Sequence, residues 1–322
     1  MENLISRKYN FKKLKGDGKL PEVDFFIYGS IREERTKFIP ENICVDKIPN
    51  VLNIEYDIEN ERYRFVKTSN RLAQPDAVLN EVFKDLISAF GQESFVEEFS
   101  DSNVFIDTTS LKHPFIFYLL KILKEDHTPK CLFLGYTEPY KYNYEKNSFQ
   151  FNLTEKFCSN QSIPGFLRRQ DPLKKRVLVS LMGFEGNRFN KVYEELKPDL
   201  GFTYAFVGFP TFQPGWQYYV YGMNIDALNS SRSFSNIIRA AADDPFDVYK
   251  ELQSIYNVHK QKDITVAAIG TKPHSIGAAM FALEREEVRL YYDFPSITKK
   301  YRTTGVGKCH FYNLSLFIRN KC

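Results

Sequence analysis

A lysine flanked by hydroxyl groups lies where an apolar run gives way to a helical pattern late in this sequence. Residues 270–275, "GTKPHS", follow "DITVAAI" and lead into "IGAAMFALERE". Lys272 brings a positive charge, Thr271 and Ser275 bring hydroxyl groups, and Gly270 lets the backbone approach a ligand closely. Backbone N–H groups and the positive end of a helix dipole favour phosphate or carboxylate at such a place. The pattern predicts an anion-binding turn.

An earlier turn has the same arrangement without the glycine. The stretch "DTTSLKHP" (107–114) also joins an apolar run to a helical pattern, and it places Thr109 and Ser110 ahead of Lys112. In both copies a proline and a histidine follow the lysine. We therefore predict ligand contacts from both turns. The alternative is that the hydroxyl groups only cap their helices and the lysines only face solvent.

The two turns resemble the lysine-bearing turn of CRISPR-associated Rossmann-fold (CARF) domains, which sense cyclic oligonucleotides. The stretches that carry the resemblance are "IGTKPHSIGAAM" (269–280) and "DTTSLKHP" (107–114). Typical members have two glycines before the Thr–Lys pair, whereas this chain has Ile269 and Gly270. The resemblance implies a Rossmann-like fold and a nucleotide or another phosphorylated small molecule as ligand. It also implies a sensor or adaptor in a larger bacterial system, such as a defence system.

Two further pairs of matching segments follow the same order in the two halves of the chain. "DFFIYGSIREERTKF" (24–38) matches "VLVSLMGFEGNRFNKV" (177–192), which aligns Arg35 with Arg188. "KCLFLGYTEPYKY" (130–142) matches "VRLYYDFPSITKKY" (288–301), which brings Glu138 and Asp293 to the ends of aligned strands. Three ordered matches indicate an internal duplication.

The alternation of apolar runs with helical patterns is typical of parallel sheets covered by helices on both faces. We predict an α/β fold of two tandem Rossmann-like three-layer units with mainly parallel sheets, related by internal pseudo-duplication. The N-terminal half is expected at residues 1–160 and the C-terminal half at residues 171–322. The expected helices include residues 77–90, 114–124, 189–196, 246–256 and 275–284.

Glu138, Asp293 and Glu185 are the candidate catalytic acids or bases. All three fall near strand ends, where the ligand crevice of an open parallel sheet lies. Arg35 and Arg188 are predicted as ligand-binding residues. The alternative is that these arginines and carboxylates form a plain charge network. The histidines are too dispersed to predict a metal site, and the identity of any cofactor stays unknown.

The stretch "GFPTFQPGWQYYVYGMN" (208–224) is expected to be a long aromatic loop after a strand. It contains Trp216, the only tryptophan of the chain. An aromatic side chain on such a loop can stack on a nucleobase. The equal alternative is a hydrophobic cover over the sheet or an interface with a partner.

Composition sets the remaining limits. A formal net charge of +4 over 322 residues gives no strong nucleic-acid signal. Five widely spaced cysteines without a C-x-x-C pair favour reduced thiols, and the polar N-terminus has no apolar signal segment. No apolar run is long enough to span a membrane. We expect a cytoplasmic protein without a membrane contact.

Three functions remain open from the sequence. The leading hypothesis is a sensor or adaptor that binds a nucleotide-like or phosphorylated small molecule at strand C-terminal ends. The second is a hydrolase or transferase that acts on nucleotides on the same scaffold. The third is a pure interaction subunit, with a protein partner or a second copy of the chain on its aromatic surfaces.

Overall fold

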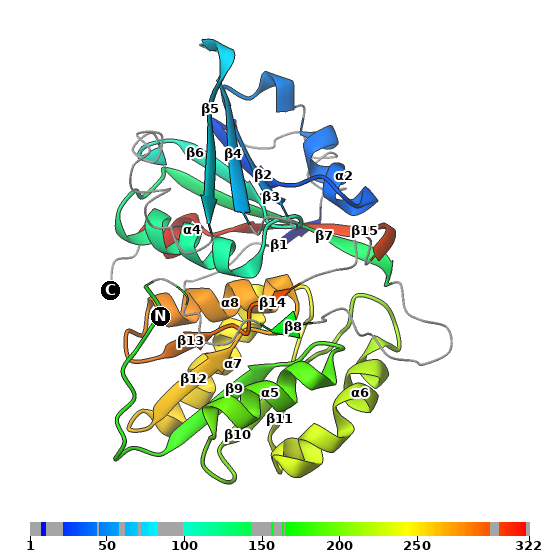
Figure 1. Ribbon diagram of the computed structural model, residues 1–322, viewed down its shortest axis with the longest axis vertical. Helices are drawn as coiled ribbons and strands as arrows, with labels where there is room; N and C mark the ends of the chain where they lie inside the picture. The colour runs from blue at the N-terminus through cyan, green and yellow to red at the C-terminus, as the bar shows by residue number, and fades with distance from the viewer. Residues whose placement is uncertain are drawn as a thin grey trace. The chain divides into compact units, whose positions relative to one another are not determined.

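The computed structural model describes residues 8–10, 22–43, 45–57, 62–69, 72–82, 99–142, 156–157, 163, 165–296 and 303–319. The chain divides into two compact units (Figure 1). Unit 1 comprises residues 1–142 and 300–322, and unit 2 comprises residues 143–299. No helix in the described ranges is long and apolar enough to cross a membrane.

Unit 2 contains a five-stranded sheet in which every neighbouring pair is parallel. Its strands are β9 (Arg176–Leu181), β10 (Thr203–Gly208), β11 (Ile237–Ala240), β12 (Asp263–Ala267) and β13 (Arg289–Tyr291). They lie in the order β11-β10-β9-β12-β13. Counted along the chain, this is the 3-2-1-4-5 order of a Rossmann sheet, and the order reverses between β9 and β12. Ligands of such sheets bind outside the strand C-terminal ends at that reversal.

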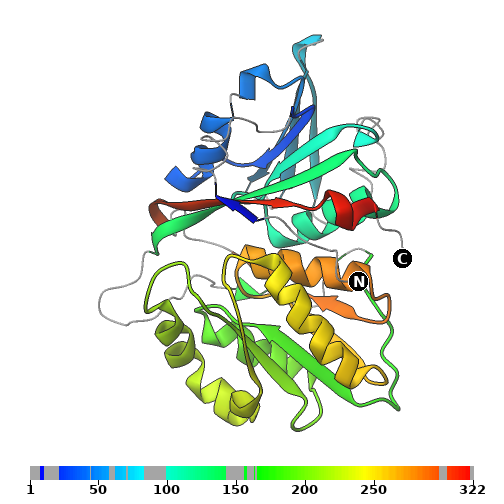
Figure 2. The same ribbon diagram turned by 180° about the vertical axis from the view of Figure 1, so that it is seen from behind.

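Helices cover both faces of this sheet, as Figures 1 and 2 show from opposite sides. One face carries α5 (Gly186–Leu196) and α6 (Trp216–Ser230), and the other carries α7 (Pro245–His259) and α8 (Lys272–Leu283). The central strands β9, β10 and β12 are mainly apolar because both of their faces are buried. On the α5–α6 face, Leu178 packs with Phe189, Val192, Val220 and Leu228. The Asp244 carboxylate caps α7 by accepting the Phe246 N–H at 2.9 Å.

Unit 1 is built on an eight-stranded mixed sheet in the order β1-β15-β7-β6-β2-β3-β4-β5. Its strands are β1 (Lys8–Asn10), β2 (Phe25–Gly29), β3 (Asn50–Asp57), β4 (Arg62–Ser69), β5 (Leu72–Val82), β6 (Asn103–Asp107), β7 (Cys131–Tyr142) and β15 (Thr303–Asn313). The four central strands, β7-β6-β2-β3, are parallel, whereas the strands on either side are antiparallel.

The helices of unit 1 are α2 (Glu34–Asn42), α4 (His113–Glu125) and α9 (Ser315–Arg319). The β2–α2–β3 and β6–α4–β7 crossovers run in opposite directions along the sheet. Right-handed connections therefore place α2 and α4 on opposite faces (Figures 1 and 2). On the α2 face, Ile39 packs with Phe26, Phe105 and Phe311.

The predicted two-unit α/β architecture is confirmed. The strand order β3-β2-β6-β7 of unit 1 equals the order β10-β9-β12-β13 of unit 2. Each pair of matching segments therefore occupies equivalent strands: β2 with β9, β6 with β12, and β7 with β13. The units differ beyond β3 and β10, because β3 continues into an antiparallel hairpin where β10 leads to the parallel strand β11.

The predicted limits of the halves, residues 1–160 and 171–322, need correction. Strand β15 returns to unit 1 and pairs antiparallel with β7, and its Phe311 is buried in that core. Strand β8 (Lys156–Phe157) pairs instead with β14 (Pro295–Ser296) of unit 2. Unit 2 is thus inserted between two neighbouring strands of unit 1.

Two element predictions also need correction. Residues 77–82 belong to β5 and not to a helix, and residues 83–90 lie outside the described ranges. The aromatic stretch after β10 is a loop only up to Gly215, because α6 begins at Trp216. The other four expected helices lie within α4, α5 and α7 and, to within one residue, α8.

Candidate functional site

Two glycine turns meet at the reversal of strand order in unit 2. Gly183 follows β9 and Gly270 follows β12. A Cβ atom on Gly183 would lie 3.3 Å from the Ile269 carbonyl oxygen, and one on Gly270 would lie 3.0 Å from the Leu181 and Met182 carbonyl oxygens. The two turns therefore touch through their backbones, and any larger residue at position 270 would push them apart.

Several backbone N–H groups at these turns have no acceptor among the residues that the structure describes. They are the N–H groups of Gly183, Gly186, Asn187, Gly270 and Thr271. Gly186 and Asn187 form the first turn of α5, whose N-cap residue makes no side-chain cap. Helix N-termini and successive free N–H groups attract anions. This edge of unit 2 therefore offers donors to an anionic group.

The two predicted hydroxyl groups of unit 2 have structural partners. Thr271 Oγ1 accepts the His274 N–H at 3.3 Å and donates to the Ala242 carbonyl at 2.9 Å. Ser275 Oγ is buried and donates to the Ala268 carbonyl at 3.3 Å. These hydroxyl groups fix the turn, as in the helix-cap alternative. Lys272 is the first residue of α8 and is half-buried. Its contact with a ligand through its positive charge stays a prediction.

Arg188 projects from the first turn of α5 and is buried at this edge. Its Nε and Nη2 donate to the two Asp293 carboxylate oxygens at 2.8 and 2.5 Å, and its Nη1 donates to the Ile269 carbonyl at 3.1 Å. Glu185 lies 3.8 Å away. Burial disfavours the charged guanidinium, but the Asp293 carboxylate outweighs burial, so the pKa of Arg188 is raised. Arg188, Asp293 and Glu185 thus form the charge network that the sequence left open.

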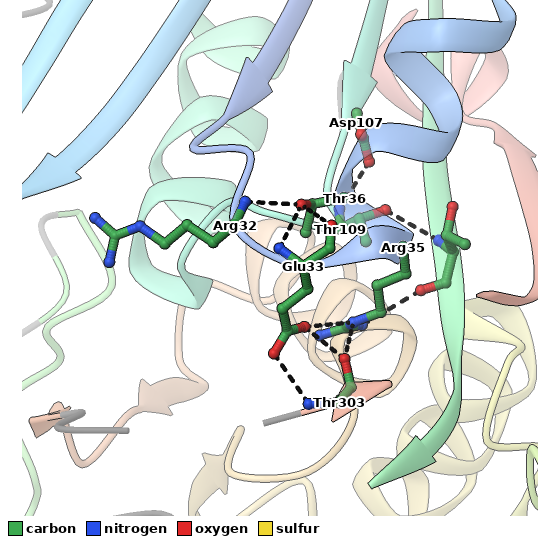
Figure 3. A network of polar contacts seen from close by, with 8 residues as sticks. Arg32, Glu33, Arg35, Thr36, Asp107, Thr109 and Thr303 are labelled. Carbon is green, nitrogen blue, oxygen red and sulfur yellow. Dashed lines mark hydrogen bonds and ion pairs between the residues drawn. The ribbon is translucent and has the colours of Figure 1, made fainter. Parts of the chain in front are cut away.

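Arg35 occupies the equivalent place in unit 1, in the first turn of α2 (Figure 3). Its Nε donates to Glu33 Oε2 at 2.9 Å and to Thr303 Oγ1 at 3.1 Å, and its Nη1 donates to the Thr137 carbonyl at 3.3 Å. The Thr303 N–H donates to the other Glu33 oxygen at 3.1 Å. Burial disfavours the charge of Arg35, yet neighbouring groups that include Glu33 raise its pKa. Both predicted arginines therefore have carboxylate partners within their own unit.

Several N–H groups at the turns of unit 1 have acceptors among the side chains of that unit. The Gly29 N–H, equivalent to that of Gly183, donates to Ser110 Oγ at 2.8 Å. The Thr109 N–H donates to Asp107 Oδ1 at 2.8 Å, and Thr109 Oγ1 accepts the Thr137 N–H at 3.0 Å. Figure 3 shows the Asp107–Thr109 contact below the strand end. The predicted hydroxyl groups of this unit thus occupy positions that would otherwise be open to an anion.

The Arg32 and Glu33 N–H groups in the same unit also find an internal acceptor. Both donate to Thr36 Oγ1, at 3.0 and 3.1 Å (Figure 3). Lys112 is the N-cap residue of α4 and is half-buried, without a side-chain cap. Unit 1 thus keeps the predicted lysine, but its Gly29 N–H is not open as the equivalent Gly183 N–H is in the described part of unit 2.

Asn224 is a site residue that sequence reasoning missed. It lies in α6 with 1% of its surface exposed, and its Nδ2 donates to the Gly183 carbonyl at 3.0 Å and to the Val220 carbonyl at 2.7 Å. Its Oδ1 is buried and has no partner within the described ranges. The spacing of Trp216, Val220 and Asn224 marks one helix face, but it carries that meaning only once this stretch is known to be helical.

Trp216 lies on the same face of α6 and contacts the same turn. Its ring centroid is 5.6 Å from that of Phe184, which directly follows Gly183, and 6.5 Å from that of Phe212. Trp216 is half-buried. The predicted aromatic group therefore does lie at the strand C-terminal edge, although a helix and not a loop presents it.

Glu138 is buried in unit 1 and pairs with His310 of β15. Its Oε1 lies 2.6 Å from His310 Nε2, and the two side chains are 2% and 4% exposed. This partner could not be foreseen from the sequence because the return of β15 to β7 was not predicted. The carboxylate is therefore engaged by a side chain of the neighbouring strand.

No protein-family model matches this chain, and no curated protein is a detectable relative of it. The chemistry of the site therefore rests on its own geometry. At the C-terminal edge of unit 2, N–H donors and a lysine are accompanied by an aromatic side chain. Such a donor set suits a phosphate-bearing organic molecule better than a metal cation, which needs oxygen, nitrogen or sulfur acceptor atoms.

Proposed function

We propose that unit 2 binds a nucleotide or a related phosphorylated small molecule at the C-terminal edge of its parallel sheet. The observation that carries this proposal is the set of backbone N–H groups without acceptors at Gly183, Gly270 and Thr271. These groups flank the reversal point of a 3-2-1-4-5 sheet, where ligands of this fold bind. An anion there accepts hydrogen bonds that the described residues leave unmade.

The duplicated unit 1 supplies an internal comparison that supports the proposal. Its equivalent Gly29 N–H has the Ser110 hydroxyl as acceptor, so free donors are not simply a consequence of this turn geometry. Lys272 adds a positive charge at the first turn of α8, and Trp216 adds an aromatic face beside Gly183. The resemblance to CARF domains favours cyclic oligonucleotides within the proposed ligand class.

We propose a sensor or adaptor role rather than catalysis. The Asp293 carboxylate accepts hydrogen bonds from Nε and Nη2 of Arg188, and the Glu138 carboxylate is hydrogen-bonded to His310. Glu185 belongs to the same charge network as Arg188. A general acid or base needs a proton-transfer path to substrate, and these carboxylates are engaged by partners within the chain. A bound ligand that is not converted acts through the conformation that it stabilises.

Calorimetric titration with a nucleotide panel tests the proposed function. The panel contains ADP, ATP, cyclic mononucleotides and cyclic oligoadenylates. For the member that binds, Lys272→Ala should lower affinity about tenfold or more, because a charge-assisted hydrogen bond contributes roughly 1.5–3 kcal/mol. The melting temperature should stay the same, since a lysine at a helix N-terminus does not favour the dipole.

The matched control is Lys250→Ala, which removes an exposed lysine from α7. Its affinity should equal that of the wild-type protein. Absence of binding by the wild-type protein across the panel would overturn the proposed function. Equal affinity of the Lys272→Ala variant would show that the turn is a helix cap and not a ligand contact.

A further inference from the structure

The Asn224 side chain has a fixed orientation because both neighbours of its amide nitrogen are carbonyl groups. Nδ2 donates to the Gly183 and Val220 carbonyl oxygens, so an amide flip would place Oδ1 against two acceptors. Oδ1 is therefore an acceptor, and it is buried without a donor in the described part of the chain. Buried side-chain acceptors are usually satisfied, so one left without a partner calls for an explanation.

This acceptor lies beside the proposed anion site. The same amide is tethered to the turn whose Gly183 N–H lacks an acceptor. Trp216, two helical turns before Asn224 on α6, contacts Phe184 of that turn. One turn thus brings together donors for an anion, an aromatic ring and a single buried acceptor.

We propose that Asn224 Oδ1 accepts a hydrogen bond from an O–H or N–H group of the bound ligand, and so selects nucleotides over plain phosphate anions. This inference rests on the proposed function and specifies its ligand class. A phosphate or polyphosphate offers mainly negative oxygens, and its few O–H groups at neutral pH are lost as these oxygens ionise. A nucleotide adds sugar hydroxyl groups and, in most bases, an exocyclic amine. Either donor has the chemistry that Oδ1 lacks.

Ligand access to this acceptor requires movement of the residues around it, and Trp216 contacts Phe184 in the turn that Asn224 holds. Oδ1 has no solvent-exposed surface, and Trp216 lies on the same face of α6. A nucleotide that reaches Oδ1 therefore changes the surroundings of the Trp216 indole, whereas an anion bound only to the backbone donors does not. Because Trp216 is the only tryptophan of the chain, tryptophan fluorescence reports changes around this residue.

The test compares ATP with inorganic tripolyphosphate by calorimetry and by Trp216 fluorescence. For the wild-type protein we expect both to bind, ATP at least tenfold more tightly, and only ATP to change the fluorescence. Asn224→Ala should weaken ATP at least tenfold and leave tripolyphosphate within about twofold. The control is Asn229→Ala, on the exposed face of the same helix, which should change neither.

The possible results distinguish failure of the Asn224 inference from failure of the proposed anion site. Equal weakening of both ligands by Asn224→Ala would mean that Asn224 only holds the Gly183 turn, and would overturn the inference. Tripolyphosphate binding with no advantage for ATP would overturn the inference and leave the anion site intact. Absence of binding by both ligands would overturn the inference, and the proposed function would then be judged on the full nucleotide panel. If Asn224→Ala does not fold, Asn224→Ser keeps a donor toward Val220, and the wild-type comparison stands without any variant.

Discussion

Replacing Asp293 by asparagine should destabilise unit 2 strongly. Arg188 and Asp293 are 8% and 1% exposed, so their charges are compensated mainly by one another. After Asp293→Asn the guanidinium keeps the Ile269 carbonyl at 3.1 Å and Glu185 at 3.8 Å, but loses its bidentate carboxylate. Removing one partner of a buried ion pair costs about 3–5 kcal/mol. We expect about 3 kcal/mol, because Glu185 retains part of the compensation.

Urea unfolding followed by Trp216 fluorescence measures this loss. The only tryptophan lies in α6 of unit 2, so the signal reports on the unit that carries the substitution. For a domain of this size, a loss of 3 kcal/mol corresponds to a fall in melting temperature of roughly 6–12 °C. Thermal melting followed by the same signal provides a second measurement.

A double variant separates loss of the ion pair from general damage. Arg188→Met with Asp293→Leu replaces both charges by apolar side chains of similar volume, which is often neutral or stabilising for a buried pair. We expect it to be more stable than the single Asp293→Asn variant. A loss below about 1 kcal/mol in the single variant, or no recovery in the double variant, would refute the role assigned to this pair.

Two further predictions follow from shifted pKa values. Burial lowers the pKa of His274 below its ordinary value, so the folded state resists protonation; the stability that this residue contributes is complete above about pH 6.5 and is lost as pH falls through the folded pKa. Unfolding free energies at pH 7 and pH 5 should therefore differ less in His274→Gln than in the wild-type protein, and an unchanged difference would contradict this. Burial raises the pKa of the Cys309 thiol to about 12, so iodoacetamide at pH 8 should modify Cys309 only after denaturation. Mass spectrometry of the Cys309 peptide checks this, and rapid modification of the folded protein would refute it.

The architecture was predictable because matching glycine and arginine residues occupy structurally constrained positions in both halves of the chain. A Cβ atom on Gly29 would lie 2.9 Å from the Ser110 carbonyl carbon, and one on its counterpart Gly183 would lie 3.3 Å from the Ile269 carbonyl oxygen, so both positions favour glycine. Arg188 is buried and Arg35 is half-buried in the first turn of the helix that follows. Such residues leave a readable pattern of apolar run, glycine and arginine in both halves of the sequence.

The limits of the units could not be predicted because strand pairing with β15 depends on contacts distant in sequence. Thr303 bonds Glu33 across 270 positions, and His310 pairs with Glu138 across 172. No local pattern distinguishes a strand that returns to unit 1 from one that continues unit 2. The same limitation applied to α6, whose many aromatic residues gave it no clear polar face before its neighbours were known.

The roles of the predicted site residues depended on hydrogen-bond partners that a sequence does not specify. Thr271 and Ser110 looked equivalent as hydroxyl donors to a ligand. In the structure Thr271 caps its own helix and leaves the nearby Gly183 N–H open, whereas Ser110 accepts the equivalent N–H of Gly29. The hydrogen-bond partner of one hydroxyl group thus separates an open turn from one that is already satisfied.

This difference leads to a last prediction, that each chain binds one ligand and not two. In unit 1 the Ser110 hydroxyl already accepts the Gly29 N–H, whereas the equivalent Gly183 N–H of unit 2 has no acceptor within the described ranges. Calorimetric titration should give a stoichiometry of one ligand per chain, and Lys112→Ala should leave affinity nearly unchanged while Lys272→Ala weakens it. A stoichiometry of two, or equal effects of the two substitutions, would mean that a ligand displaces the Ser110 contact. In that case the Ser110 contact would belong to the ligand-free state of a functional site in unit 1.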